Sequence, residues 1–314
     1  MDLFSKIKSQ LDLLKRQEKQ LEKLQSRVDS CTKQVQRLQG QVSQIQLALG
    51  RIESRQLQSL NSHKAAANEF QVFSQWGEDG IIQFLLRHIP IRNKIFVEFG
   101  VQNYVESNTR FLLINNNWSG LILDSSEKNI DYIQKDSIYW KYNLKAVQAF
   151  ITKDNINDLL SQNSVTGEIG LLSIDIDGND YWVWEAIHVV TPAIVIIEYN
   201  FRFGKEKAVT IPYDEQFVRS EAHYSMIYFG ASLKALCQLA DRKGYDFVGS
   251  NTAGNNAFFV RKDLRPEVIR SLTPEEGYVI GQFREARDRN GNLCYLSLPE
   301  EEAILASLPL IEVG

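Results

Sequence analysis

The sequence has few cysteines, methionines and prolines. Its 314 residues include 3 Cys, 2 Met and 7 Pro. The cysteines, Cys31, Cys237 and Cys294, are too few for a disulfide framework and too scattered for a zinc site. They indicate ordinary buried thiols in a reducing compartment, so we expect a cytoplasmic protein.

A basic excess and long apolar runs are also missing. The 35 Lys and Arg against 39 Asp and Glu give a net charge of -4, which argues against a protein that wraps nucleic acid. Residues 1–20 are charged throughout and lack the apolar core of a signal peptide, and no run of about 18 uninterrupted apolar residues follows. We therefore expect no transmembrane segment. A peripheral position at the inner face of the membrane is compatible with this composition.

Residues 1–60 contain no proline, and apolar residues recur there with spacings that alternate between three and four. These positions are Leu21, Leu24, Val28, Cys31, Val35, Leu38, Val42, Ile45, Leu49 and Ile52, and the phase extends back to Leu3. This heptad is typical of a coiled coil, roughly 80 Å long at 1.5 Å per residue. We expect it to join identical chains as a dimer, trimer or tetramer. The alternative is a single amphipathic helix that lies on the rest of the chain.

Residues 61–69 break the heptad and are interpreted as a linker to a domain at 70–314, of which about the last 50 residues are a C-terminal extension. Short apolar runs alternate there with helix-like segments: KIFVEFG, SGLILDSS, LKAVQAFIT, GLLSIDIDG, PAIVIIEYN, YDFVGSN and NAFFVRKD. The first five predict buried parallel strands with helical crossovers, and the last two predict an antiparallel edge hairpin. The expected fold class is α/β, a Rossmann-like, doubly wound, mostly parallel sheet preceded by the coiled coil.

Acidic residues follow four of the predicted strands, where ligands bind in an open α/β sheet. The strand ends carry Glu98 and Gly100, then Asp124 and Ser125, then Asp175 and Asp177, and finally Glu198 and Asn200. A single acid there can equally cap a helix or pair with a lysine. Four acidic strand ends together indicate a ligand site.

The acid after the second strand indicates an adenosine ligand, because a carboxylate there can accept hydrogen bonds from both ribose hydroxyls. Asp124 lies 24 residues beyond Gly100, about the spacing of a βαβ unit. The first loop, GVQNYVES, lacks the further glycines that a pyrophosphate requires, and the sequence has no GxxxxGK[ST] loop for ATP. S-adenosylmethionine, which has cationic amino and sulfonium groups and no phosphate, fits these loops best.

Several motifs occur between roughly residues 70 and 263: FSQWGEDGIIQFLL, FVEFG, SNT, WSGLILDSS, LLSIDIDGNDYWVWEAI and GNNAFFVRKDL. Their order resembles the FkbM-type branch of class I S-adenosylmethionine-dependent methyltransferases, many of which are encoded with polysaccharide assembly genes. The resemblance implies that Glu98 and Gly100 form the first cofactor loop and that Asp124 binds ribose. It also implies that Thr152 lies by the adenine and that Gln75 and Glu78 help to close the site. We add Ser125 and Asp175 to the expected cofactor contacts.

Oxygen ligands converge from the fourth and fifth strand ends. Asp177, Glu198 and Asn200 suit Mg²⁺, Mn²⁺ or Ca²⁺ better than zinc, and such a metal would lower the pKa of an acceptor hydroxyl. Alternatively, these residues hydrogen-bond the substrate directly. Asp177 and His223 are the catalytic candidates, the latter because the ordinary pKa of histidine is near neutrality. A histidine at a helix start is otherwise structural.

Residues near the last strands offer candidate substrate contacts. Tyr181, Trp182 and Trp184 form either a platform for sugar rings or ordinary core packing. Arg202 and Lys205 lie in a long connection, where substrate-selecting insertions usually belong, and either meet an anionic glycan or form a solvated loop.

The predicted function is an S-adenosylmethionine-dependent O-methyltransferase that acts on a hydroxyl of a saccharide or glycoconjugate. A metal-dependent glycosyltransferase is the enzymatic alternative, because Asp175-Ile176-Asp177 is also a DxD pattern that can hold a nucleotide sugar through a cation. A non-catalytic coiled-coil scaffold with a degenerate methyltransferase domain is the other alternative.

Overall fold

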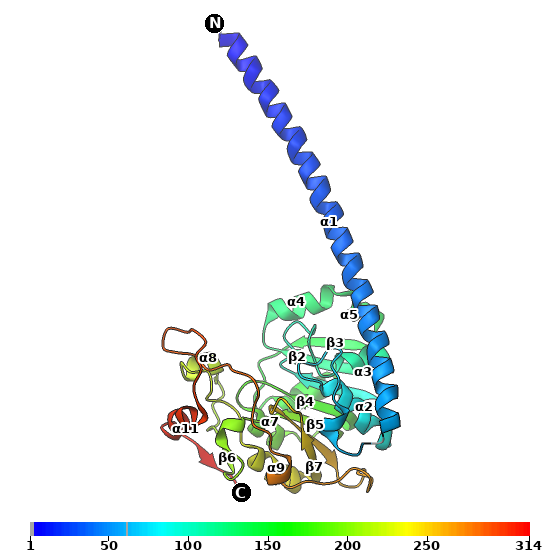
Figure 1. Cartoon of the computed structure of the whole chain (residues 1–314), viewed down its shortest axis with the longest axis vertical. Coiled ribbons are helices and arrows are strands. Elements are labelled where there is room, and N and C mark those ends of the chain that lie inside the picture. Colours follow the sequence, from blue (N-terminus) through cyan, green and yellow to red (C-terminus); the bar gives the residue numbers. More distant parts are fainter. Residues whose placement is uncertain (1–2, 61) are drawn as a thin grey trace. The chain divides into compact units, whose positions relative to one another are not determined.

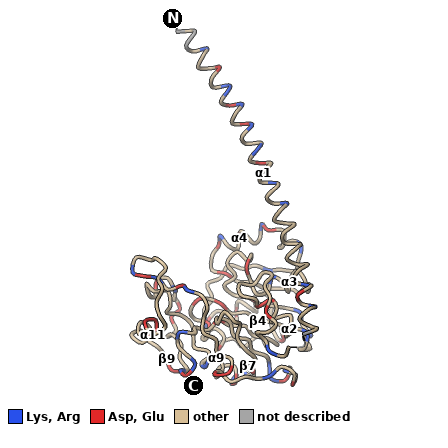
Figure 2. The backbone as a smooth tube through the Cα atoms, viewed as in Figure 1, with Lys and Arg blue, Asp and Glu red and all other residues tan. Residues whose placement is uncertain are grey.

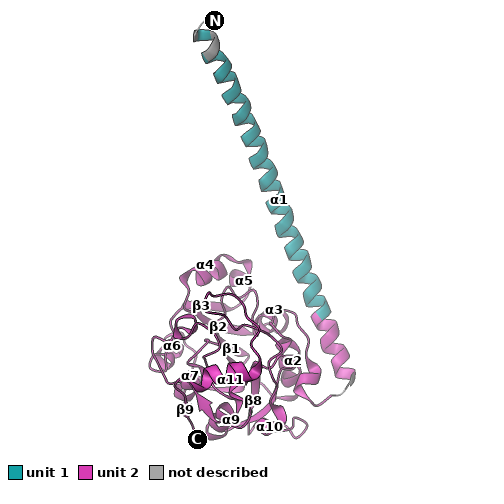
Figure 3. Cartoon of the chain, turned by 60° about the vertical axis from the view of Figure 1, so that its left-hand side comes forward, with its two compact units in different colours: residues 1–49 teal, residues 50–314 magenta. Residues whose placement is uncertain are grey.

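The computed structural model describes residues 3–60 and 62–314, which belong to two compact units, residues 1–49 and 50–314 (Figure 3). Helix α1 (Leu3–Leu60) makes up the described part of the first unit and continues into the second (Figure 1). The predicted long N-terminal helix is therefore confirmed, and its association with other chains stays a prediction. Within the described ranges, no helix combines the length and apolar character needed to cross a membrane.

The second unit begins inside α1, earlier than the boundary at residue 60 that the heptad suggests. Gly50 is buried, and a Cβ atom there would lie 2.5 Å from Cγ2 of Val72 and 3.0 Å from Cζ of Phe111. The glycine thus lets the helix backbone approach these side chains. The segment interpreted as a linker contains the 3₁₀ helix η1 (Ala65–Asn68), of which Ala65 and Asn68 are buried. Residues 61–69 therefore include packed structure.

Seven strands form the main sheet in the order β3-β2-β1-β4-β5-β8-β7. The parallel strands are β1 (Ile95–Phe99), β2 (Ser119–Asp124), β3 (Leu144–Gln148), β4 (Gly167–Ile174) and β5 (Val190–Glu198). Strand β8 (Asn256–Arg261) runs antiparallel to β5 and to the edge strand β7 (Tyr245–Ser250). The predicted fold class, a Rossmann-like doubly wound sheet with an antiparallel edge hairpin, is confirmed.

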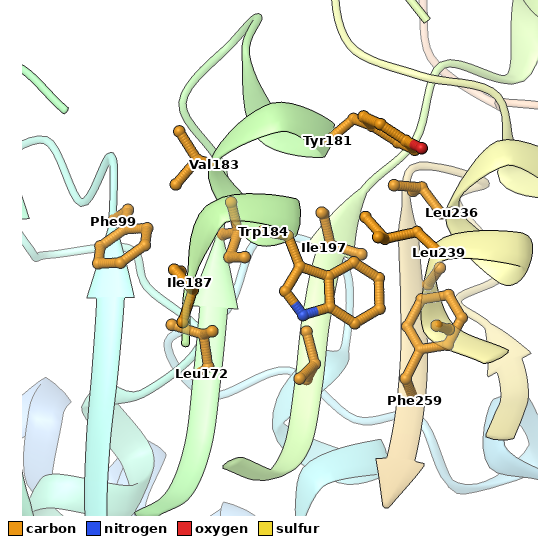
Figure 4. Close-up of a cluster of buried hydrophobic side chains, with 14 of the residues drawn as sticks. Phe99, Leu172, Tyr181, Val183, Trp184, Ile187, Ile197, Leu236, Leu239 and Phe259 are labelled. Atoms are coloured by element: carbon orange, nitrogen blue, oxygen red, sulfur yellow. The ribbon is translucent and has the colours of Figure 1, made fainter. Parts of the chain in front are cut away.

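Helices cover both faces of this sheet because successive strand residues point to opposite faces. In β1, Phe96 packs with residues of α2 (Glu78–His88), α3 (Arg110–Asn116) and α4 (Glu127–Lys135). The next residue, Val97, belongs to the cluster that includes α6 (Ile156–Gln162), α7 (Asp180–Ala186) and α9 (Leu233–Lys243). Figure 4 shows Trp184 of α7 lying over the strands beside Ile197 and Phe259. The short helix α5 (Ser137–Lys141) precedes β3.

The long connection after β5 and the C-terminal extension pack on each other. The connection contains η2 (Phe201–Phe203), β6 (Val209–Thr210) and α8 (Arg219–Ala222), and the extension contains α10 (Pro274–Gly277), α11 (Leu298–Ala306) and β9 (Ile311–Glu312). Strand β9 pairs with β6, and a third hydrophobic cluster joins Ile211 and Ile227 to Ala286 and Leu305. The extension, which lies outside the family resemblance, is thus part of the globular unit.

Candidate functional site

A cavity of about 270 Å³ lies at the carboxyl ends of β1, β2 and β4. Its lining includes five of the predicted site residues, namely Gly100, Asp124, Ser125, Asp175 and Asp177. Gln102, Asn129, Ala149, Phe150 and Phe217 are further lining residues that sequence reasoning did not assign. Three strand ends that are distant in sequence therefore meet at one site, as the parallel sheet predicts.

Gly100 allows the closest backbone approach in this cavity. Its φ is 70°, and a Cβ atom would lie 1.6 Å from the carbonyl oxygen of Asp175. A side chain would therefore clash with the end of β4, and the positive φ independently favours glycine. The glycine after β1 is required by the meeting of β1 and β4, whatever ligand the cavity holds.

Asp124 ends β2 and organises the adjoining loops. Its Oδ2 accepts a hydrogen bond from the backbone N–H of Gln102 (2.7 Å), and its Oδ1 accepts from the N–H of Ser126 (2.9 Å) and from Nδ2 of Asn129 (3.1 Å). A carboxylate has about four acceptor positions, so Oδ2 retains one. Since Asp124 lines the cavity, this oxygen can accept from a ligand hydroxyl.

Glu98 shapes the glycine-poor first loop instead of lining the cavity. Its Oε2 accepts from the hydroxyls of Ser107 (2.6 Å) and Thr109 (2.5 Å), and its Oε1 accepts from the N–H of Asn108 (2.9 Å). Burial raises the pKa of this carboxyl, although these hydrogen bonds oppose the shift. Glu98 thus fixes the SNT segment, and its expected contact with a cofactor stays a prediction.

Two non-glycine residues of the first loop have positive φ angles. Gln102 and Tyr104 have φ values of 48° and 60°, in the left-handed region that glycine usually occupies. The Tyr104 hydroxyl is hydrogen-bonded to that of Thr109 at 3.0 Å, which ties the loop to the same anchor as Glu98. The loop therefore reaches a compact shape without the second glycine of the family pattern.

Three residues that the resemblance assigns to the cofactor site do not line the cavity. Gln75 is exposed. Glu78 is buried and accepts hydrogen bonds from Nδ2 of Asn251 and of Asn256, both at 2.8 Å, so it joins α2 to the edge hairpin. The Thr152 hydroxyl accepts from the N–H of Asn155 (3.1 Å) just before α6. Glu78 and Thr152 thus make hydrogen bonds within the fold, and the cofactor roles of all three residues stay predictions.

Asp175, Asp177 and Glu198 form an acid cluster in which one carboxylate oxygen of each lies within 4.8 Å of the others. Burial raises the pKa values of Asp175 and Glu198 well above their usual range, and repulsion between the acids adds to both shifts. Oε2 of Glu198 is buried without a hydrogen-bond partner among the described residues. Three carboxylates with an unpaired oxygen suit a hard divalent cation such as Mg²⁺, Mn²⁺ or Ca²⁺.

Asn200, expected as a third ligand, makes three hydrogen bonds within the fold, and its role as a ligand stays a prediction. Its Oδ1 accepts from the N–H of Arg202 (3.2 Å), and its Nδ2 donates to the carbonyls of Ile227 (2.8 Å) and Phe229 (3.1 Å). The amide is 1% exposed and its oxygen is used within the fold. The third carboxylate of the acid cluster belongs to Asp175.

Arg219 is the cation nearest to the acid cluster that the contacts reveal, and sequence reasoning missed it. Its Nη1 lies 2.5 Å from Oδ1 of Asp177, and its Nη2 lies 2.6 Å from Oε2 of Glu285. Burial disfavours the charge of Arg219, but Glu285, Glu198 and Asp177 outweigh this and raise its pKa above the usual value. No sequence spacing links residues 177, 219 and 285, so only the fold could reveal the contact.

Asp180 fixes the turn that carries the acid cluster. One of its oxygens accepts from the N–H of Ile176 (2.8 Å) and the other from the N–H of Gly178 (2.9 Å), which holds Asp177 at a φ of 57°. Burial raises the pKa of Asp180 to about 6. The DIDGND string contained this residue, but its role as a turn anchor was not predicted.

His223 has no contact with the acid cluster. Its Nδ1 is hydrogen-bonded to the hydroxyl of Ser225 at 2.6 Å, and its ring packs on Tyr224. Burial lowers its pKa, and the nearby Arg289 adds to this shift. These contacts give the histidine a structural role at the end of α8.

The candidate substrate contacts are mostly buried. Tyr181 and Trp184 are each 1% exposed and belong to the core, so core packing is the correct interpretation for both. Arg202 is 3% exposed and pairs with Glu285 and Glu301, both at 3.0 Å. It therefore holds the C-terminal extension and does not face an anionic substrate. Phe217, from the same long connection, lines the cavity.

Comparisons with known proteins give fold-level similarity. No protein-family model matches the chain, and no curated protein matches it. Similar solved structures include the N-terminal domain of EvdMO1 with SAH bound, at 12% identity and a TM-score of 0.40, covering 67% of this chain and 94% of that chain. An O-methyltransferase family protein from Burkholderia thailandensis shares 9% identity, with a TM-score of 0.36 and coverages of 58% and 57%. An S-adenosylmethionine-dependent methyltransferase from Clostridium acetobutylicum shares 8% identity, with a TM-score of 0.37. The match covers 58% of this chain and 89% of that chain. At these scores the similarities carry no argument about function, which has to rest on the site.

Proposed function

We propose that this chain is a cytoplasmic S-adenosylmethionine-dependent O-methyltransferase that acts on a hydroxyl of a saccharide or glycoconjugate. The observation that carries the proposal is the cavity at the ends of β1, β2 and β4. Asp124 keeps an acceptor position there, and the loop that contains Gly100 has no glycine-rich cradle for phosphate. The saccharide class rests on the motif resemblance, and the reducing compartment on three cysteines without disulfides.

The acid cluster supports hydroxyl chemistry beside the cofactor. Methyl transfer is an in-line displacement in which the acceptor oxygen attacks the methyl carbon while the carbon–sulfur bond breaks, and its electron pair stays on sulfur. Asp175 and Asp177 line the same cavity, and Asp177 is 58% exposed. These carboxylates can accept a hydrogen bond from the acceptor hydroxyl, orient it and direct its proton toward solvent.

Asp175, Asp177 and Glu198 would also hold a divalent cation, which supplies positive charge that lowers the pKa of a bound hydroxyl. Oε2 of Glu198, which is buried without a partner among the described residues, favours such a ligand. This chain's own contribution is to position the three oxygens, through the Asp180 turn and the end of β5.

The N-terminal helix supports assembly of the enzyme into a homo-oligomer. Its heptad leucines, isoleucines and valines between Leu21 and Leu49 are more than half exposed, for example Leu21 (68%), Leu24 (57%) and Val28 (56%). Burial of this apolar seam against identical helices would remove it from water. The helix would then act as an oligomerisation device and a spacer beside a polysaccharide assembly complex.

The test is transfer of an isotope-labelled methyl group from S-adenosylmethionine to a panel of saccharides, read by mass spectrometry of the products. We expect label on a sugar oxygen, and loss of most activity in Asp177→Asn. Asp263→Asn, an exposed acid paired with Arg261, is the matched control and should retain activity. Glycosyl transfer from a UDP-sugar would instead establish the DxD alternative, and neither reaction with any acceptor would favour the scaffold.

A further inference from the structure

Arg219 lies beside the acid cluster, and its positive charge is attracted to the carboxylates. Its guanidinium bridges Asp177 and Glu285 and stacks on Phe229, with Cζ 3.7 Å from the ring centroid. Its Nε donates to the carbonyl of Met226 at 2.8 Å. The Phe229 and Met226 contacts do not depend on Asp177, so the side chain can release this acid and stay in place.

Glu285 connects this arginine to the C-terminal extension. Besides Arg219, it contacts Nη1 of Arg202 at 3.0 Å, and Arg202 pairs in turn with Glu301 of α11. The side chains of Arg202 and Glu285 are 1% and 27% exposed, so solvent screens this pair weakly, whereas Asp177 is 58% exposed. An acid of the extension thus shares the guanidinium with Asp177, each acid through a different nitrogen.

We propose that Arg219 is a built-in counter-ion that competes with a divalent cation for Asp177, and that Glu285 sets the outcome by drawing the guanidinium away. The proposal deepens the metal-assisted form of the proposed function and rests on it for the position of the cation. In this account Arg219 and Glu285 are positioning residues. The C-terminal extension, through Glu285, tunes how strongly the acid cluster binds its metal.

The physical reason is that two cations cannot share one carboxylate without repulsion. A divalent ion on Asp175, Asp177 and Glu198 has to displace or tolerate the Arg219 charge, which weakens metal binding. If Glu285 loses its charge, Arg219 is held more tightly by Asp177, and the metal competes less well. If Arg219 loses its charge, the guanidinium no longer links Glu285 to Asp177. Glu285 then no longer affects the affinity of the acid cluster for metal.

The experiment is titration of the full-length protein with Mn²⁺ in the absence of S-adenosylmethionine, with free Mn²⁺ measured by electron paramagnetic resonance. We expect Arg219→Met to tighten Mn²⁺ binding about tenfold, or about 1.4 kcal/mol. Glu285→Gln should weaken binding roughly threefold in the natural chain but leave it unchanged in the Arg219→Met background. Arg219→Lys, which keeps the charge without the two-pronged contact, should give a smaller gain than Met.

Matched controls separate this effect from general charge changes. Arg261 also bridges two acids, Glu168 (2.9 Å) and Asp263 (2.7 Å), beside the amino end of β4, so Arg261→Met should leave Mn²⁺ affinity unchanged. Asp177→Asn in the Arg219→Met background should abolish the gain. Circular dichroism confirms that each variant is folded.

Three results would overturn the proposal: no Mn²⁺ binding in any variant, no gain in Arg219→Met, or an equal Glu285→Gln effect in both backgrounds. The readout contains neither cofactor nor acceptor. If the predicted pattern of Mn²⁺ affinities is found without methyl transfer, the proposed function is wrong and the competition between Arg219 and the metal is supported. If methyl transfer is found without that pattern, the proposed function is supported and the competition is wrong.

Discussion

Helix α1 and the globular unit place their apolar residues in opposite ways. Within residues 50–314, Val97 and Ile197 are fully buried and the sheet is covered on both faces. On α1, Val28 and Val35 are 56% and 53% exposed, while residues of both charge signs occur along the helix (Figure 2). The globular unit buries its apolar surface internally, whereas the apolar residues of the helix are exposed, and we predict that partner helices cover them. Each unit should therefore respond to its own kind of mutation.

The largest effect is expected from Trp184→Ala in the globular core. Trp184 is 1% exposed and packs on Phe259 and Tyr245, so its truncation should lower the free energy of unfolding by about 3–5 kcal/mol. Urea denaturation followed by circular dichroism measures this change. Trp140→Ala, at a side chain that is 75% exposed, should cost less than about 0.5 kcal/mol. Equal losses would contradict the core assignment of Trp184.

The helix should respond to Val35→Glu, which puts a charge into the middle of the seam. Burial of identical carboxylates against one another should cost the assembly at least about 3 kcal/mol. Sedimentation at micromolar concentration should show monomers for this variant and oligomers for the natural chain, with the urea transition of the globular unit unchanged. Gln36→Glu, one position outside the seam, should leave the oligomer intact. A natural chain that is already monomeric would refute the coiled-coil prediction.

A pH effect on stability is expected in the globular unit. Burial raises the pKa of Asp79 from 3.8 to about 6, although hydrogen bonds from Val72, Phe73 and Ser74 favour the charged form. The folded state then holds this proton more tightly than the unfolded chain, so stability falls as pH rises from about 4 to about 6. Between about pH 4 and pH 6, Asp79→Asn should reduce the loss in the free energy of unfolding by about 2 kcal/mol. Urea transitions at several pH values measure this free energy. An identical pH dependence in the natural protein and the variant would argue against the raised pKa of Asp79.

The smallest effect is expected from Thr152→Ala, which tests whether Thr152 contacts the adenine or only stabilises the fold. Thr152→Ala removes the hydroxyl that accepts from the N–H of Asn155, so it should cost about 1 kcal/mol of stability. Because Thr152 does not line the cavity, the affinity for S-adenosylmethionine should change less than twofold. Calorimetric titration of this variant checks the point. A tenfold loss of affinity would restore the adenine contact that the motif implies.

The sequence predicts the sheet well because its signals are local. Apolar runs bounded by turn residues identify all seven strands of the main sheet, and the close spacing of the last two runs predicts the antiparallel pair β7 and β8. The convergence of Asp124, Asp175 and Asp177 also follows, since parallel strand ends meet at one edge. These inferences need only short segments and the rules of sheet topology.

The remaining features depend on contacts between distant segments. Arg219 and Glu285 meet through a connection and an extension that no motif covers. The Nδ2 of Asn200 donates to the carbonyls of Ile227 and Phe229, which backbone packing brings to it. Glu98 is used by its own loop. A residue type at a strand end indicates a candidate, but which partner takes its hydrogen bonds is decided by the tertiary structure.

The measurement that tests the central claim most directly is calorimetric titration of the full-length protein with S-adenosylmethionine and S-adenosylhomocysteine. Asp124→Asn and Ala149→Phe are the matching variants, one altering the ribose acceptor and the other filling the cavity that both residues line. The account predicts micromolar binding that is weakened at least about tenfold by each variant, or about 1.4 kcal/mol. Binding that survives both changes, or no binding to the natural chain, would contradict it.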